Sequence, residues 1–207
     1  MTGLFIAISF ILAYLLGSFP SAYVVARYRK GIDIRTVGSR NMGAMNTFYK
    51  IGFWYGILVL SLDISKGVLA VAIPTLFGLG QIFQLISGVI VVLGHAFPVF
   101  LNFKGGKGGA TCIGVLAFLI PWGVPAYALI FGIMLLITRF PTLSYAVAFL
   151  CFPFLAWLVY HDPALIIFSI GILLIPGVKY IPRIVEIRSK SGGWKHLFLR
   201  HNLKDRF

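Results

Sequence analysis

Small and polar residues gather at positions 38–46 and form a group suited to holding a phosphate. The segment reads Gly-Ser-Arg-Asn-Met-Gly-Ala-Met-Asn. Its glycines let backbone N–H groups turn toward an anion. Ser39, Asn41 and Asn46 add side-chain donors. Arg40 adds a fixed positive charge. An ordinary polar turn with a loop arginine explains the segment equally well.

A second cluster extends from Gly94-His95 to Thr111 and surrounds two lysines with glycines. The residues are Lys104, Gly105, Gly106, Lys107, Gly108 and Gly109. An apolar run follows, so we expect the cluster at a helix N-terminus, where cations, close backbone approach and the helix dipole favour anions. It is not a Walker A loop, because a glycine stands where that loop has Ser or Thr. A flexible basic loop would explain the lysines but not the glycines, so we predict anion binding here.

A third polar group lies inside an apolar run. Asp63 and Lys66 are three residues apart and therefore share one face of a helix. Either charge alone near the middle of a bilayer would cost roughly 2.5–3.5 kcal/mol, so we expect an inward-facing ion pair. We favour a structural role for this pair over a catalytic one. A functional role for His95 rests on its position beside the glycine-rich cluster.

The composition is that of a membrane protein. The chain has 207 residues, of which 59% are hydrophobic and 11% charged, with a mean hydropathy of +0.96, and the apolar surplus must face lipid. A net charge of +13 would suggest nucleic acid, but no polar domain is present to carry a basic stripe, so we expect no nucleic-acid partner.

Metal and disulfide chemistry are not indicated. The acidic residues are scattered and form no cluster, so we predict no metal and no cofactor. Cys112 and Cys151 lie inside apolar runs, which indicates reduced packing residues. The apolar N-terminal stretch has no Lys or Arg before Arg27. It therefore lacks the basic start of a cleaved signal peptide, and we expect it to be retained as a first span.

Seven spans can be drawn through the apolar runs. They cover residues 3–26, 51–76, 81–103, 109–124, 124–138, 143–160 and 163–181. The alternative is six spans, with a reentrant section around the two prolines and the glycine of residues 121–125.

The distribution of charge favours seven spans. With that number, every Lys and Arg except Lys66 falls on one side of the membrane, whereas six spans would place Arg139 and the basic C-terminal residues on the other. The positive-inside rule then gives an outside N-terminus and a cytoplasmic C-terminus. We therefore predict an all-α bundle of seven transmembrane helices forming one domain over 1–207. Its basic tail, 182–207, is expected to lie on the anionic inner leaflet.

Four stretches of the sequence resemble a known family, the bacterial multi-pass acyltransferases that move a fatty acyl group from acyl-phosphate to glycerol 3-phosphate. The resemblance rests on residues 17–20 (Gly-Ser-Phe-Pro), 38–46, 63–67 (Asp-Ile-Ser-Lys-Gly) and 94–111. It implies the same seven-span architecture that the charges indicate. It also implies a product, lysophosphatidic acid, that begins phospholipid synthesis at the cytoplasmic face of a bacterial inner membrane, with acyl-phosphate, glycerol 3-phosphate and membrane lipids as partners.

The resemblance also assigns roles to residues. Ser39, His95 and Lys104 would be catalytic, with His95 orienting a substrate oxygen and the proton passing to the departing phosphate. Thr142 stands where a Ser is common. The residues that would bind substrate phosphate are Arg40, Asn41, Asn46, Gly105, Gly106, Lys107, Gly108, Thr111 and Thr142.

The chain departs from the family pattern at four positions. Arg40 replaces a usual glycine, Tyr49 stands where an arginine is normal, and Gly177 and Tyr180 occupy the places of a His and an Asn. These departures leave open an acyl-phosphate-dependent transferase with a different acceptor or altered activity. A third interpretation, an anion or lipid transporter, rests on the intramembrane pair of Asp63 and Lys66.

Overall fold

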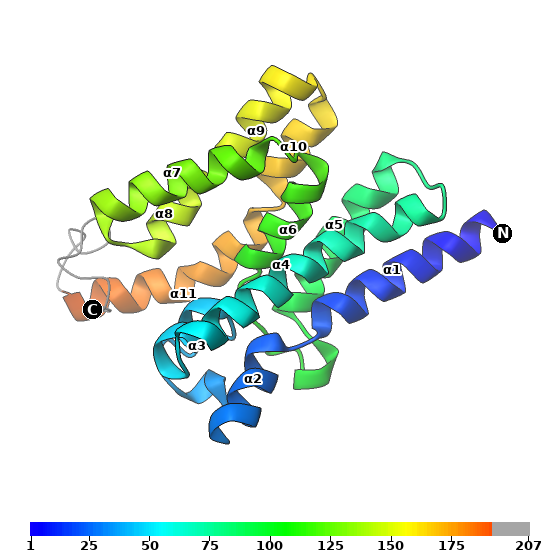
Figure 1. Cartoon of the computed structure of the whole chain (residues 1–207). Helices are drawn as coiled ribbons and strands as arrows, with labels where there is room; N and C mark the ends of the chain where they lie inside the picture. Colours follow the sequence, from blue (N-terminus) through cyan, green and yellow to red (C-terminus); the bar gives the residue numbers. More distant parts are fainter. Residues whose placement is uncertain (192–207) are drawn as a thin grey trace. The chain divides into compact units, whose positions relative to one another are not determined.

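The structure, a computed structural model, describes residues 1–191, and the regular elements in that part of the chain are all helical (Figure 1). The all-α prediction is therefore confirmed. The elements are α1 (Thr2–Ser18), α2 (Ser21–Lys30), η1 (Ile34–Thr36), α3 (Ala44–Lys50), α4 (Phe53–Leu76), α5 (Gln81–Ala96), η2 (Val99–Leu101), α6 (Gly109–Leu119), α7 (Gly123–Thr138), α8 (Pro141–Ala148), α9 (Cys151–Leu155), η3 (Ala156–Tyr160), α10 (Pro163–Gly171) and α11 (Leu174–Ser191).

Five segments of the described chain are long and apolar enough to cross a membrane. They are Thr2–Lys30, Phe53–Leu76, Gln81–Leu101, Pro141–Tyr160 and Pro163–Glu186. The fourth and fifth predicted spans correspond to α6 and α7, which are apolar but shorter, with 11 and 16 residues.

Proline accounts for two of the helix boundaries that differ from the sequence expectation. The predicted first span, 3–26, is broken between Ser18 and Ser21. Pro20 has no N–H to donate there and disfavours helical backbone at Phe19, which is extended. The third span was expected to reach residue 103, but α5 ends at Ala96, just before Pro98.

The C-terminal boundary also differs. Helix α11 continues past the predicted end of the last span at residue 181 and reaches Ser191, with Pro182 inside it. Residues 182–191 of the predicted basic tail are therefore helical. The rest of that tail, 192–207, lies outside the described residues.

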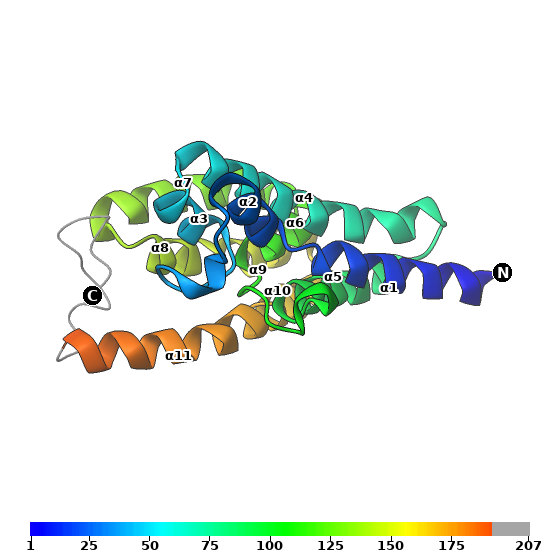
Figure 2. The same cartoon turned by 90° about the horizontal axis from the view of Figure 1, so that it is seen from below.

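The described helices gather into two compact units. The first unit contains Met1–Leu119 and Ile172–Lys179. In it α4 packs against α1, α5 and α6, and α1 lies beside α5 along its length (Figures 1 and 2). The second unit contains Ile120–Gly171 and the described residues from Tyr180 onward. There α7 packs on α8 and α9, and Tyr127, Phe149 and Phe152 form a cluster of aromatic rings.

Glycines bring the helices of the first unit into backbone contact. A Cβ added at Gly114 in α6 would overlap the carbonyl oxygen of Ile64 in α4, and one at Gly67 in α4 would overlap that of Thr111. Between α1 and α5, Gly17 and Gly94 make the same kind of approach. Small residues allow such packing of membrane helices, where dispersion contacts replace the hydrophobic effect. The spacing of these helices therefore depends on glycine.

We predict that Gly114→Ala lowers the thermal stability of the detergent-solubilised protein by about 1–3 kcal/mol, because α4 and α6 must separate to admit the methyl group. The matched control is Gly132→Ala in α7, where the added Cβ has open space and the better helix propensity of alanine should leave stability unchanged or higher. Thermal unfolding followed by tryptophan fluorescence measures both. Equal melting temperatures for the two variants would contradict the packing described here.

Candidate active site

Asn46 holds together the loop of residues 31–46, which contains the polar residues of 38–46 and is called the first segment below. Its side chain is buried, and its amide nitrogen lies 3.0–3.1 Å from the carbonyl oxygens of Ile34, Val37 and Asn41. Its amide oxygen accepts a hydrogen bond of 3.1 Å from the backbone N–H of Ser39. The amide group thus holds the turn together from within, whereas Ser39 is half-buried and Arg40 exposed at the loop surface.

Arg40 adopts a backbone conformation that glycine prefers. Its φ is +56°, in the left-handed region, and its N–H donates to the carbonyl of Val37 at 3.0 Å. This conformation carries a steric cost for a residue with a Cβ, so on physical grounds glycine is the residue expected there.

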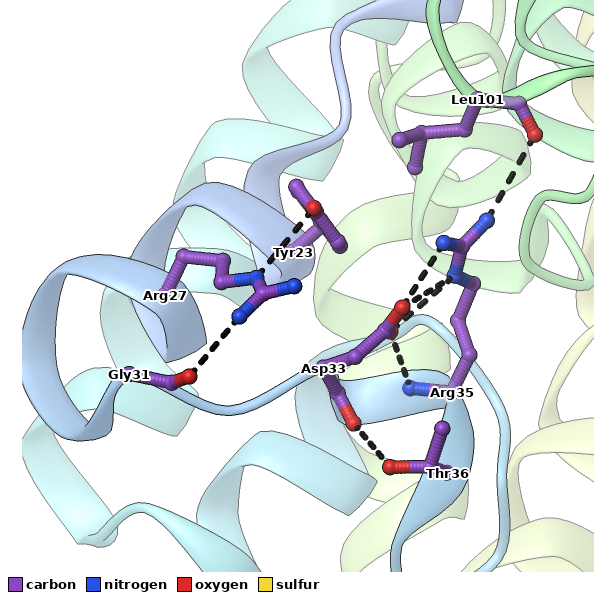
Figure 3. Close-up of polar contacts among 7 residues, drawn as sticks. All are labelled: Tyr23, Arg27, Gly31, Asp33, Arg35, Thr36 and Leu101. Carbon is purple, nitrogen blue, oxygen red and sulfur yellow. Dashed lines mark hydrogen bonds and ion pairs between the residues drawn. The ribbon is translucent and has the colours of Figure 1, made fainter.

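Arg35 joins the first segment to the second (Figure 3). Its guanidinium forms an ion pair with Asp33 at 2.7 Å and lies over the Tyr23 ring, 5.2 Å from the centroid. A further N–H points to the carbonyl oxygen of Leu101 in η2, at 3.5 Å. Asp33 also accepts the backbone N–H of Arg35 at 2.9 Å. The hydrogen bonds from Arg35 hold the pKa of the Asp33 carboxyl below its usual value of 3.8, and they raise the pKa of Arg35.

The glycine-rich segment folds back onto the C-terminal end of α5. The N–H of Gly105 donates to the carbonyl of Ala96 at 3.2 Å, and the N–H of Gly106 to that of His95 at 3.1 Å. Residues Asn102 and Phe103, with positive φ angles of 51° and 59°, make the reversal. The amides of Gly105 and Gly106 are therefore engaged with backbone carbonyls.

The two polar segments meet at Gly106. A Cβ there would overlap both Nε2 of His95 and the carbonyl oxygen of Met42, which belongs to the first segment. Only glycine fits between these groups without displacement. This contact brings Met42 and the glycine-rich segment together in one unit.

A cluster of buried polar side chains surrounds the ring of His95. Oδ1 of Asp63 lies 2.9 Å from Nζ of Lys66 and accepts a 2.9 Å hydrogen bond from Ser21. The same oxygen is 3.7 Å from Nδ1 of His95, and Oγ1 of Thr111 is 3.4 Å from that nitrogen. All five side chains are buried. Asp63 and Lys66 thus contact each other, as expected, within a larger network.

The predicted site residues therefore lie in three settings. His95, Asn46 and Thr111 are buried and bonded to protein groups. Lys104 is exposed and Lys107 half-buried in the segment leading into α6. Thr142, the second residue of α8, belongs to the other unit.

Sequence reasoning missed Ser21, Tyr23 and Arg35. The Asp33-x-Arg35 spacing was the available signal for the ion pair, but nothing in it indicates the contact with Leu101, 66 residues away. The sequence does not indicate which loops lie next to each other in the folded protein.

The pairing of Asp33 with Arg35 predicts a pH-dependent stability. Because the folded state lowers the pKa of Asp33, the pair stabilises the protein above pH 3.8, and the stabilisation is lost as the pH falls through the lowered pKa. Asp33→Asn should therefore be less stable than the wild type at pH 7, and the difference in melting temperature should shrink below pH 3.8. In an Arg35→Met background the same substitution should show little pH dependence. A difference that stays constant with pH would contradict this pairing.

Comparisons with known proteins agree on one family. Residues 7–190 match the family described as Glycerol-3-phosphate acyltransferase. A relative in Dehalococcoides mccartyi named glycerol-3-phosphate acyltransferase 2 is 51% identical over 203 residues, which cover 97% of each chain. The glycerol-3-phosphate acyltransferase of Bacillus subtilis is 48% identical over 139 residues, covering 67% of this chain and 72% of that protein.

Solved structures of similar chains support the same conclusion. The crystal structure of PlsY (YgiH), an integral membrane glycerol 3-phosphate acyltransferase in its glycerol 3-phosphate form, superposes with a TM-score of 0.81 at 32% identity. The alignment covers 90% of this chain and 92% of that one. The lysophosphatidic acid form gives a TM-score of 0.76. This chain therefore belongs to the glycerol-3-phosphate acyltransferase family of integral membrane proteins.

Proposed function

We propose that this protein transfers a fatty acyl group from acyl-phosphate to the hydroxyl of glycerol 3-phosphate. The glycerol oxygen bonds to the acyl carbon, the bond from that carbon to the phosphate oxygen breaks, and the hydroxyl proton passes to the departing phosphate. The products are lysophosphatidic acid and inorganic phosphate. Family membership and the polar site both support this reaction.

The main structural support for this proposal is the contact at Gly106. It brings together two segments of different character, one with Ser39 and Arg40 and one with Lys104 and Lys107. The reaction needs two phosphorylated substrates held side by side, and its leaving group departs readily without a strong acid. Cations and amide groups fixed around the phosphates therefore supply the main catalytic effect.

In the glycine-rich segment we assign phosphate binding to the lysines and the start of α6. Helix α6 begins at Gly109, and the first amides of a helix have no partner within it. Lys104, Lys107 and these amides can converge on one phosphate. Gly105 and Gly106 contribute by letting the segment pass close to His95, since their own N–H groups are already bonded.

His95 is proposed as a positioning residue. Its carbonyl accepts the N–H of Gly106, and its ring fixes the surface on which Gly106 lies. The Asp63 network orients that ring. In this proposal His95 acts through Gly106 and does not contact the substrate. The buried ion pair then has a structural role, so it no longer favours a transporter.

We propose that the bundle crosses a bacterial inner membrane seven times, with the N-terminus outside and the site facing the cytoplasm. The positions of the basic residues support this topology. The side of the membrane on which Arg139 lies, directly after α7, distinguishes seven spans from six. The basic residues of 182–191, which continue α11, would lie at the same face.

A cysteine-labelling experiment tests this topology. In a background lacking Cys112 and Cys151, both buried, Gly80→Cys in the α4–α5 loop should react with an impermeant maleimide in intact cells. Arg139→Cys should react only after permeabilisation. Labelling of Arg139→Cys in intact cells would support the six-span alternative.

The catalytic proposal is tested with purified protein. In detergent it should form lysophosphatidic acid from acyl-phosphate and glycerol 3-phosphate, and Lys104→Ala should lower kcat/KM by about 10- to 100-fold through loss of a cation beside the phosphate. Lys104→Arg should retain most activity, as should Lys30→Ala, which removes an exposed lysine of α2.

Two results would contradict the catalytic proposal. Turnover by Lys104→Ala equal to that of Lys30→Ala would exclude the phosphate role of Lys104. Release of inorganic phosphate with another hydroxyl or amine acceptor, and none with glycerol 3-phosphate, would show that the protein uses a different acceptor, as the departures at Arg40, Tyr49, Gly177 and Tyr180 leave open.

A further inference from the structure

Lys179 of α11 reaches the end of α5 beside the glycine-rich segment, and the mechanism above does not use it. Its ammonium nitrogen donates to the carbonyl oxygen of Ala96 at 3.0 Å. That same oxygen accepts the N–H of Gly105 at 3.2 Å. The lysine is therefore separated from the glycine-rich segment by one shared acceptor atom.

Two aromatic residues help to fix this position. The ammonium group lies 4.5 Å from the centroid of the Phe97 ring, within the range of a cation–π interaction. The carbonyl of Phe97 in turn accepts a 2.9 Å hydrogen bond from the hydroxyl of Tyr14 in α1. Residues of α1, α5 and α11 thus hold the charge of Lys179 in one place, and all of them belong to the first unit.

The positive charge of Lys179 is not neutralised by a carboxylate within the described residues. Asp33 pairs with Arg35, Asp63 with Lys66, and Glu186 with Arg183. Asp162 belongs to the second unit, where it caps the start of α10. An ammonium group has three N–H donors, and in the described chain Ala96 is the one hydrogen-bond acceptor of Lys179. Two donors remain for an anion.

We propose that Lys179 is a further cation of the phosphate site and binds the phosphate group of one of the two substrates. This inference rests on the proposed function and adds a residue from α11 to the two loop segments. A half-buried ammonium group beside Gly105 lowers the energy of a phosphate there, and its tether to Ala96 keeps the charge in place before substrate binds. The shared chemistry is a phosphate dianion, supplied by either acyl-phosphate or glycerol 3-phosphate.

Substitutions separate the charge from the tether. Lys179→Gln keeps a donor for the Ala96 carbonyl but loses the charge, and Lys179→Arg keeps both. We expect Lys179→Gln to raise the KM of one substrate about tenfold with a smaller effect on kcat, and Lys179→Arg to stay within about threefold of the wild type. The substrate whose KM rises identifies the phosphate that is bound. The control is Lys30→Gln, because the ammonium of Lys30 also donates to a carbonyl, that of Lys50, at 2.7 Å.

Binding of inorganic phosphate gives a second readout that does not depend on turnover. Isothermal titration of the detergent-solubilised protein should show phosphate bound about tenfold more weakly by Lys179→Gln than by the wild type or Lys30→Gln. Weaker phosphate binding with no acyl transfer by any form would support Lys179 and overturn the proposed function. Normal turnover with KM values and phosphate affinity unchanged in Lys179→Gln would overturn the role of Lys179 alone. Loss of kcat without a change in either KM or phosphate affinity would likewise overturn it, because it indicates a purely structural tether.

Discussion

The architecture of the site depends on a steric constraint at Gly106. This residue lies where the His95 ring and the Met42 carbonyl leave no room for a methyl group. Two chain segments, more than fifty residues apart in sequence, therefore meet at backbone distance. We infer that this contact gathers cations and amides of both segments, because a reaction between two phosphorylated molecules requires a concentration of positive potential.

The buried polar network beneath this contact has a structural explanation. A carboxylate inside an apolar bundle is tolerated only when paired and hydrogen-bonded, and Asp63 has Lys66 and Ser21 for these purposes. The network also reaches the ring of His95. Burial of charge in the bundle thereby fixes the side chain against which Gly106 packs. Arg35 reinforces the arrangement from the surface through Asp33 and Leu101.

Part of this fold could be predicted from the sequence, because hydropathy reports which segments favour lipid. It identified the apolar runs and the all-α class. Hydropathy could not place the helix ends, because a helix can continue beyond its apolar run if the local sequence allows. Helix α11, for example, passes residue 181 unbroken. The break at Pro20, by contrast, follows from local chemistry, and proline was the available signal.

The polar residues of the site were predictable as a group but not in their individual roles. Asn46 and Ser39 look equivalent in the sequence, yet Asn46 is buried and bonded to four backbone groups, whereas Ser39 is half-buried. The path of the backbone determines which side-chain hydrogen-bond donors are bonded to the protein itself and which remain for a substrate. Lys179 likewise appears in the sequence as one of several basic residues near the end of the last predicted span and beyond it, and only the packing of α11 distinguishes it.

We propose that backbone contact between the two segments assembles the phosphate site, and the activity of Gly106→Ala is the test of this assembly. A displacement of about 1 Å costs roughly a hundredfold in rate when substrates must be held in register. We predict that Gly106→Ala lowers kcat/KM for acyl transfer about a hundredfold, while Gly132→Ala in α7, at a position with open space, retains the wild-type value. Activity of Gly106→Ala within a factor of two of the wild type would show that the phosphate site does not depend on this contact.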